Sequence, residues 1–383
     1  MAKNKAPSWL FYGWMSLIGI GILIGLWGAI KLLIEGHGPT AGTSDQVPWG
    51  IFVPTYVFFV AASAGCVTVS LGYALGVKSF ELIMKRAVFL AIVTLLTGGM
   101  VIFLDLGNPF NILQPLLSPN LATPLWWMGV FYTLYLAFLV IDYYLLEKGD
   151  TAKTRVVSVL AALSAIAVHS TLGFVFGFAA VRTYFGSAFS PIYFMVIAII
   201  IGTALLLFVT ILQHKFTRTE MSPELHSLIL NLGKFLGVAV ATGIFFSIWK
   251  DLAGLRSTVE TTALAYQYLL FGAGSWWYWG IVVVIGLFIP AFLLLNARTR
   301  SINGILVAST FALIGMFAAR VEFTIGGQVV SLIPELKHLQ WPFASYTATF
   351  GEIAVVILAF AATALLYTLG ARKLSLEEVT HRD

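Results

Sequence analysis

The sequence predicts an all-α integral membrane protein with about ten transmembrane helices, and three observations carry that prediction. Hydrophobic residues make up 59% of the 383 residues and charged residues only 10%, whereas soluble domains carry roughly 25% charged residues. Apolar runs of about 20 residues, the length that crosses a bilayer as a helix, recur along the chain. The connections between the runs are too short to form a soluble domain, so we expect one polytopic membrane domain over residues 1–383.

The apolar runs place ten spans. The first follows a basic N-terminus, and its apolar core is longer than the roughly 7–15 residues of a signal peptide and lacks a small-residue cleavage site. We therefore interpret it as a spanning helix. The predicted spans are residues 9–32, 49–76, 86–105, 124–146, 156–180, 191–212, 227–249, 276–296, 302–320 and 345–370.

The distribution of basic residues predicts the orientation in a prokaryotic cytoplasmic (inner) membrane. Of the 22 Lys and Arg residues, fifteen fall on one side of the predicted spans and six on the other, while Lys234 begins a span on the richer side. Because Lys and Arg are enriched in cytoplasmic loops, both termini are expected in the cytoplasm. The loop "GNPFNILQPLLSPNLATP" after Asp105 is then expected to face outward.

Three short motifs recur in the same order, four spans apart. An even separation gives both copies the same orientation, which predicts two four-helix bundles, residues 48–182 and 191–321, flanked by helices 9–32 and 345–370. The paired motifs are "FLDLG" (103–107) with "WKDLAG" (249–254), "LWWMG" (125–129) with "SWWYWG" (275–280), and "AAVR" (179–182) with "AARV" (318–321).

Ionisable residues inside a bilayer are costly, so each one is a candidate functional group. Asp105 ends its span, and it is either a capping carboxylate or a group that exchanges protons beside a ligand. His169 is the deepest titratable residue and is either a hydrogen-bonded packing residue or a proton relay. Asp251 follows Lys250, which favours an ion pair, and Glu352 lies in the last span with no partner evident from the sequence.

Two arginines are expected to have a simpler role. Arg182 and Arg320 are predicted to end their helices on the outer side. A cation there complements the negative end of the helix dipole.

Several classes of function are excluded by what the sequence lacks. No cluster of basic residues alternates with aromatics, which argues against nucleic-acid binding. The single cysteine, Cys66, cannot hold an iron–sulfur cluster without further thiolates. A bis-histidine haem would need a second deep histidine besides His169, and no zinc, phosphate-loop or hydrolase motif is present. We expect no metal site in the chain.

The segment from "VPWGIFVPTYVFFVAASAG" (47–65) to "DLGNPFNILQPLLSPNLATPLWWMGVFYTLY" (105–135) resembles the NrfD/PsrC family, the quinone-reactive membrane anchors of multisubunit respiratory oxidoreductases. The matching features are a helix start at Trp49, the "DLGNP" turn and the "NLATP" helix start. Asn108 replaces the arginine or lysine usual in that turn. The ten-span length and "RVEFTIGGQVV" (320–330) are similar to the DsrP/HmcC/HybB branch.

The resemblance implies a subunit that is not catalytic alone, binds menaquinone or a similar quinone near the outer face, and holds no haem or iron–sulfur cluster. Its implied partners are an extracytoplasmic ferredoxin-like iron–sulfur subunit, other respiratory subunits including cytochrome subunits, and membrane lipids. The quinone-binding residues that it implies are Trp49, Tyr56, Asp105, Asn108 and Trp127.

Quinone reduction consumes two protons as well as two electrons, so a carboxylate or histidine must lie within reach of the ring oxygens. Asp105 and His169 are the expected catalytic groups, and His169, Glu352 and Asp251 the expected proton path. The alternative function is a secondary, proton-coupled transporter, which would also combine repeats with few buried charges. The acidic and aromatic residues gather at the outer ends of the spans, which favours the quinone-linked anchor.

Overall fold

A computed structural model describes residues 7–177, 182–186, 190–332, 343–374 and 376, apart from the side chains of Phe110, Pro115 and Leu116. In this part of the chain ten helices are long and apolar enough to cross a membrane, which confirms the predicted number of spans. The last residues of the predicted span 156–180 lie outside the described residues. The ten helices are α1 (Ser8–Glu35), α3 (Phe52–Ala74), η1 with α4 (Lys78–Phe80 and Glu81–Asp105), α6 (Pro124–Lys148), α7 (Thr151–Gly177), α8 (Ser190–Thr217), α9 (Pro223–Leu255), η3 with α11 (Trp276–Phe288 and Ile289–Leu295), α12 (Ile302–Gly326) and α13 (Phe350–Lys373).

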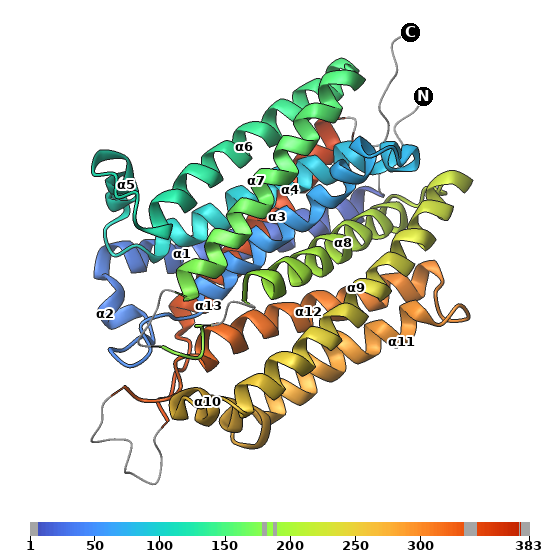
Figure 1. Cartoon of the computed structure of the whole chain (residues 1–383). Coiled ribbons are helices and arrows are strands. Elements are labelled where there is room, and N and C mark those ends of the chain that lie inside the picture. The colour runs from blue at the N-terminus through green and yellow to red at the C-terminus, as the bar shows by residue number, and fades with distance from the viewer. Residues whose placement is uncertain (1–6, 178–181, 187–189, 333–342, 375, 377–383) are drawn as a thin grey trace.

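The long helices run roughly side by side, with α3 and α8 at the centre (Figure 1). Helix α3 packs against α4, α7, α8 and α12, while α8 packs against α7, α9 and α12. Helices α1 and α13 form an antiparallel pair beside α4, in which Trp14 Nε1 donates to Thr368 Oγ1 at 3.0 Å. The chain therefore enters α1 and leaves α13 at the same end of the molecule.

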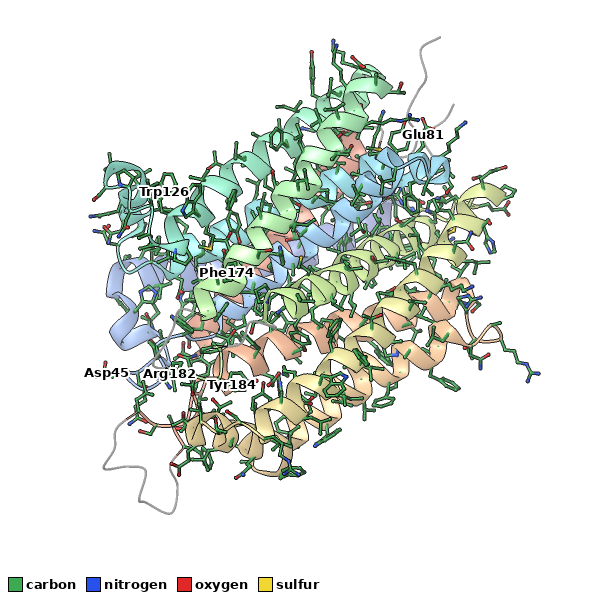
Figure 2. All side chains as sticks on the ribbon, in the orientation of Figure 1. Asp45, Glu81, Trp126, Phe174, Arg182 and Tyr184 are labelled. Atoms are coloured by element: carbon green, nitrogen blue, oxygen red, sulfur yellow. The ribbon has the colours of Figure 1, made fainter. Side chains whose placement is uncertain are left out.

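The two ends of the molecule differ in structure. We call the end where α4 finishes the Asp105 end, and the end where α4 begins the Glu81 end, where Figure 2 labels Glu81. The Asp105 end carries the short helices α2 (His37–Thr40), η2 (Pro109–Leu113), α5 (Gln114–Leu117) and α10 (Glu260–Phe271). Helix α10 has 12 residues, too few to register as a span, and was not predicted.

Contact between α3 and α8 depends on two glycines. A side chain on Gly65 would overlap the Ala198 carbonyl, and one on Gly202 would overlap the backbone of Gly65. Small residues let transmembrane helices approach closely and gain van der Waals contact. Cys66 lies buried beside this contact, with Sγ 3.6 Å from the Gly202 carbonyl oxygen, consistent with a packing role.

Two predicted span boundaries are wrong for an electrostatic reason. The seventh span was predicted to stop at residue 249, before Lys250 and Asp251, but α9 continues to Leu255 because these charges point into the protein. The last span was predicted from residue 345, but α13 begins at Phe350, where Thr349 and Glu352 form a capping box. From the sequence, such charged residues were expected to lie at the membrane interface, whereas in the structure they make contacts within the protein.

Replacing Gly202 with alanine is expected to lower the free energy of unfolding by about 1–3 kcal/mol, because overpacking forces the backbones of α3 and α8 apart. Gly99 in α4 has nothing within 4 Å of a built Cβ, so Gly99→Ala is the matched control. Alanine is the better helix former, and the control should be neutral or slightly stabilising. Thermal unfolding in detergent measures the stability of both variants. Equal melting temperatures for Gly202→Ala and Gly99→Ala would contradict the tight α3–α8 contact.

Candidate functional site

The candidate site is centred on Asp105, the last residue of α4. The chain leaves the helix through Leu106 and a Gly-Asn-Pro sequence, which turns it toward η2. The Asp105 Oδ1 atom lies 3.8 Å from Nε2 of His37, the first residue of α2. About a quarter of each side chain is exposed. Gly36, with φ +77°, makes the turn from α1 into α2 that brings His37 to this position.

A second carboxylate, Glu352, lies in the same region and is fully used by hydrogen bonds. Its Oε1 accepts from the Tyr346 hydroxyl at 2.8 Å, and its Oε2 accepts from the backbone N–H of Gly42 at 2.9 Å and of Thr349 at 2.8 Å. A built Cβ on Gly50 would lie 2.6 Å from Glu352 Oε1, so glycine is required there. Glu352 thus ties α13 to the segment before α3.

The electrostatics of this region favour a charged histidine. The pKa of His37 lies above its ordinary value because the Asp105 carboxylate interacts with the protonated ring, and the Glu352 charge adds to the effect, while partial burial acts against it. The pKa of Tyr346 is also raised, through burial and the neighbouring Glu352 charge, so its hydroxyl remains a donor. The arrangement can therefore hold and release a proton at the His37–Asp105 pair.

Trp49 is fixed by residues from distant parts of the chain. Gln328 accepts from the Trp49 N–H and donates to the Trp49 carbonyl oxygen, both at 3.0 Å. The indole ring lies edge-on to Phe176 and tilted against Phe185, with centroid distances of 5.3 and 5.5 Å. Trp49 therefore sits at the junction of α3, α7 and the end of α12.

Arg182 supports this junction, while its predicted place at the end of its own helix falls on residues 178–181, which lie outside the described residues. Its guanidinium donates to the carbonyl oxygens of Gln328 at 2.9 Å and Val330 at 3.3 Å, and also to that of Gln46. Figure 2 shows Arg182 beside Tyr184 at the Asp105 end. The prediction for Arg320 is wrong, because α12 continues past it to Gly326.

Tyr56 begins a row of buried polar side chains between α3, α4, α6 and α7. Its hydroxyl is hydrogen-bonded to the Tyr132 hydroxyl and lies 3.8 Å from Met128 Sδ. Deeper in the protein, Ser63 Oγ bonds Tyr135 Oη at 2.9 Å.

Closer to the Glu81 end, the Ser158 hydroxyl donates to the fully buried Asp142 carboxylate at 3.0 Å. At that end of the row, Lys85 Nζ lies 3.4 Å from Glu147 Oε1. The row runs from the Asp105 end almost to the opposite end.

Three further predicted residues lie on α6, in the turn after α4 and on α7. Trp127 is 40% exposed, donates to the Leu121 carbonyl oxygen at 2.9 Å and stacks on Phe131. Asn108 is exposed in the turn after α4. His169 is buried in α7 at 1% exposure, eight residues before the described end of that helix at Gly177.

The predicted ion pair of Asp251 with Lys250 is confirmed, with 3.9 Å between Oδ1 and Nζ. The sequence missed that Lys250 also lies 3.5 Å from Glu322 Oε2. Tyr278 donates to Asp251, and Tyr184 donates to Glu322 at 2.8 Å. In this second half of the chain, therefore, a buried lysine lies between the two acids and pairs with both.

Sequence reasoning also missed His37 and the polar row. Nothing local marks His37 as the partner of a residue almost seventy positions away. The row did leave a signal in the sequence, because polar residues recur seven positions apart on two helices. They are Tyr56, Ser63 and Ser70 on α3, and Tyr135 and Asp142 on α6. That spacing puts polar groups on one face of each helix.

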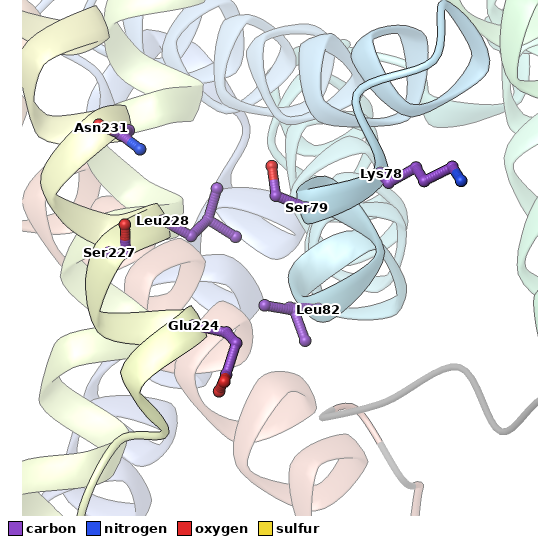
Figure 3. Close-up of a pocket in the computed structure, with 7 residues that line it drawn as sticks. All are labelled: Lys78, Ser79, Leu82, Glu224, Ser227, Leu228 and Asn231. Atoms are coloured by element: carbon purple, nitrogen blue, oxygen red, sulfur yellow. The ribbon is translucent and has the colours of Figure 1, made fainter.

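A shallow hollow lies elsewhere, at the Glu81 end between the start of α4 and the start of α9 (Figure 3). Lys78, Leu82, Glu224 and Leu228 are among its lining residues. It is remote from Asp105 and contributes nothing to the candidate site. Among the residues that the structure describes, no group of three or more His, Cys, Asp or Glu side chains is placed to hold a metal ion.

Comparison with known proteins places the chain among membrane subunits of respiratory complexes. It is 27% identical to the Hdr-like menaquinol oxidoreductase integral membrane subunit of Archaeoglobus fulgidus, over 88% of this chain and 86% of the relative. It is 24% identical to a subunit of the selenate reductase of Mesobacillus selenatarsenatis, over 93% of both chains. It is 23% identical to the menaquinone reductase integral membrane subunit of Nitratidesulfovibrio vulgaris, over 95% of this chain and 91% of the relative.

The family model described as polysulphide reductase, NrfD, matches residues 39–332. This stretch contains His37's partner Asp105, Trp49 and the whole polar row. The match covers well over half of the 383 residues, and the resemblance inferred from the "DLGNP" turn is confirmed. The chain belongs to the NrfD family of polysulphide reductase membrane subunits.

Proposed function

We propose that the chain is the quinone-reactive membrane subunit of a multisubunit respiratory oxidoreductase. The observation that carries the proposal is the partly exposed His37–Asp105 pair at the end of a transmembrane helix, where a membrane-dissolved quinone and an external partner can meet. Oxidation of a quinol releases two electrons and two protons. The electrons would pass to an extracytoplasmic ferredoxin-like iron–sulfur subunit, which works with other respiratory subunits, cytochrome subunits among them. The names of two relatives, which refer to menaquinol and menaquinone, support menaquinone as the quinone.

In this proposal Asp105 accepts a hydrogen bond from the quinol hydroxyl, and the His37–Asp105 pair takes up the proton. General base catalysis of this kind needs a group within hydrogen-bond reach whose pKa lies near the working pH. The Asp105 carboxylate raises the pKa of His37 above its ordinary value. Trp49 and Tyr56 would line the ring and tail of the quinone, and Asn108 and Trp127 the approach from the loop. When bound, the quinone would supply the two-electron chemistry, which the side chains of this chain do not supply.

The polar row offers a route for protons from the Asp105 end into the membrane. Hydroxyl groups of tyrosine and serine can both donate and accept hydrogen bonds, which is what a relay requires. The proton path predicted from the sequence remains a separate hypothesis. It consists of Glu352, which adjoins the His37–Asp105 pair, His169 on α7 and Asp251 on α9.

We further propose two four-helix units, α3–α4–α6–α7 and α8–α9–α11–α12, related by the sequence repeat, with the Asp105 end facing away from the cytoplasm. The packing of α6 on α7 and of α9 on α11 supports this division. The α1–α13 pair would lie outside both units, against membrane lipids.

A secondary transporter is the second candidate, and one observation favours it. The eighth span is wound as a π-helix over Trp276–Phe288 and continues through Pro290, and transporters use irregular helices at their sites. An iron–sulfur subunit in the purified complex would decide for the oxidoreductase.

Asp105→Asn is expected to lower quinol oxidation by the purified complex by about 10²-fold or more, the usual effect of losing a general base. Glu35→Gln is the matched control, because Glu35 lies at the same end and forms only an exposed pair with Lys31. Assembly and bound quinone are measured alongside turnover. Wild-type turnover in an assembled Asp105→Asn complex would reject the role of Asp105 and leave the family assignment intact.

The rate of quinol oxidation is expected to rise with pH through the raised pKa of His37, because the pair can take up a proton only after His37 has lost its own. The attraction between the protonated ring and Asp105 is complete below the ordinary histidine pKa of about 6.5 and is lost as pH rises through the raised value. In His37→Gln this limb of the pH profile should disappear. In Asp105→Asn this limb should move to lower pH. A limb that is unchanged in both variants would exclude the His37–Asp105 pair as the proton acceptor.

Asp142→Asn is expected to abolish proton movement coupled to quinol oxidation in reconstituted vesicles, because the amide cannot carry a proton past Ser158. Thr133→Val is the control, since Thr133 is exposed on the same helix and bonds only its own backbone at Gly129. A pH-sensitive dye inside the vesicles reports the movement. Proton movement in Asp142→Asn equal to that in Thr133→Val would show that the row is structural.

A further inference from the structure

Two fully buried polar side chains in the interior, Arg320 of α12 and His169 of α7, have polar atoms without partners. Arg320 is 2% exposed and His169 is 1% exposed. Within the described part of the chain, neither Nε and Nη2 of Arg320 nor the two ring nitrogens of His169 meets the geometry of a hydrogen bond. Leaving a buried polar atom without a hydrogen-bond partner destabilises the folded protein. Two buried side chains of this kind point to a ligand.

Helix geometry places the two side chains at similar depth. Both α7 and α12 run toward the Asp105 end, and Phe176 of α7 contacts Phe323 of α12 with ring centroids 5.4 Å apart. His169 lies seven residues before Phe176 and Arg320 three residues before Phe323, about 10 and 4.5 Å along the helix axes. Side chains lean toward the start of a helix, and the long arginine stem carries its head group further in that direction. Phe194 of α8 lies between the two helices, because its ring centroid is 4.3 Å from the Arg320 guanidinium and 5.8 Å from the Phe176 centroid.

The surroundings of Arg320 account for its open donors. Its guanidinium lies over the Phe194 ring, 4.3 Å from the ring centroid. This contact uses one flat face of the guanidinium and leaves the N–H groups at its edge free to bind. The carboxylate two residues along, Glu322, already binds Lys250 and Tyr184.

The contrast with Arg182 shows that the open donors are a property of the position. Arg182 is the last residue of "AAVR" (179–182), and Arg320 is the third residue of the similar motif "AARV" (318–321). Its guanidinium is satisfied by the carbonyl oxygens of Gln328, Val330 and Gln46. Arg320 has no comparable set of carbonyls on the described residues, so a bound molecule must fill that role.

We propose that Arg320 and His169 form an internal binding site for a small hydrogen-bond-accepting ligand, a water molecule or a small inorganic anion. A water molecule would accept from Arg320 and donate to the unprotonated nitrogen of His169. An anion would accept from both residues and balance the buried cation. In either case the ligand bridges α7 to α12 and joins the first half of the chain to the second. The site is independent of quinone binding at Asp105.

The test is a cryo-electron-microscopy map of the purified wild-type complex that resolves ordered water. Density that belongs to no protein atom is expected within hydrogen-bond distance of both Arg320 and His169. It should be lost in Arg320→Met and kept in Lys250→Met, which removes another buried cation of the same region. Arg320→Lys keeps the charge and should retain the density, which guards against a methionine variant that fails to assemble.

Exchange of chloride for bromide separates the two sources of the ligand. Stronger density in bromide identifies an anion, and unchanged density identifies water; both outcomes support the site. A wild-type map in which the Arg320 edge donates to protein carbonyl oxygens, with no density beside His169, would overturn the proposal. So would density that persists in Arg320→Met.

Discussion

The structure depends on one constraint: a charged or polar group within the hydrocarbon layer must find its partner inside the protein. The chain meets that constraint with contacts between helices. Lys85 meets Glu147 between α4 and α6, and Lys250 meets Glu322 between α9 and α12. Because an unpaired buried charge costs several kcal/mol, these contacts help to select which helices become neighbours. The glycine contact between α3 and α8 then sets how closely the central helices approach.

The same constraint explains why the candidate site lies at the end of the helices. A group that exchanges protons with a quinol has to change charge, and that change is cheapest where water can reach it. His37 and Asp105 are each about one quarter exposed, whereas Asp142 and Glu352 are almost completely buried and held by fixed donors. The buried carboxylates are therefore suited to shape the site or to relay protons, and the partly exposed pair to exchange them.

The sequence predicted the ten spans and the end of α4 at Asp105, because both depend on apolar length and on turn residues close in the chain. It failed where contacts join distant segments. Lys250 and Asp251 were interpreted as the end of a span because a charge next to an apolar run usually marks the interface, and only the position of Glu322 shows otherwise. The pairing of His37 with Asp105 is of the same kind. The seven-residue spacing of the polar row was readable from the sequence and is the signal to use in related chains.

The two halves of the chain contain the same motif, but the acid of the motif has a different charged partner in each half. Asp105 and Asp251 occupy corresponding positions of the repeat, but Asp251 follows a lysine that binds it and Glu322 inside the protein. Among the described residues, the ion-pair partner of Asp105 is His37, whose charge depends on pH. A lysine stays charged across the physiological pH range, whereas a histidine can change its charge within that range. The asymmetry between lysine and histidine is thus the physical reason to assign proton exchange to the first half of the chain.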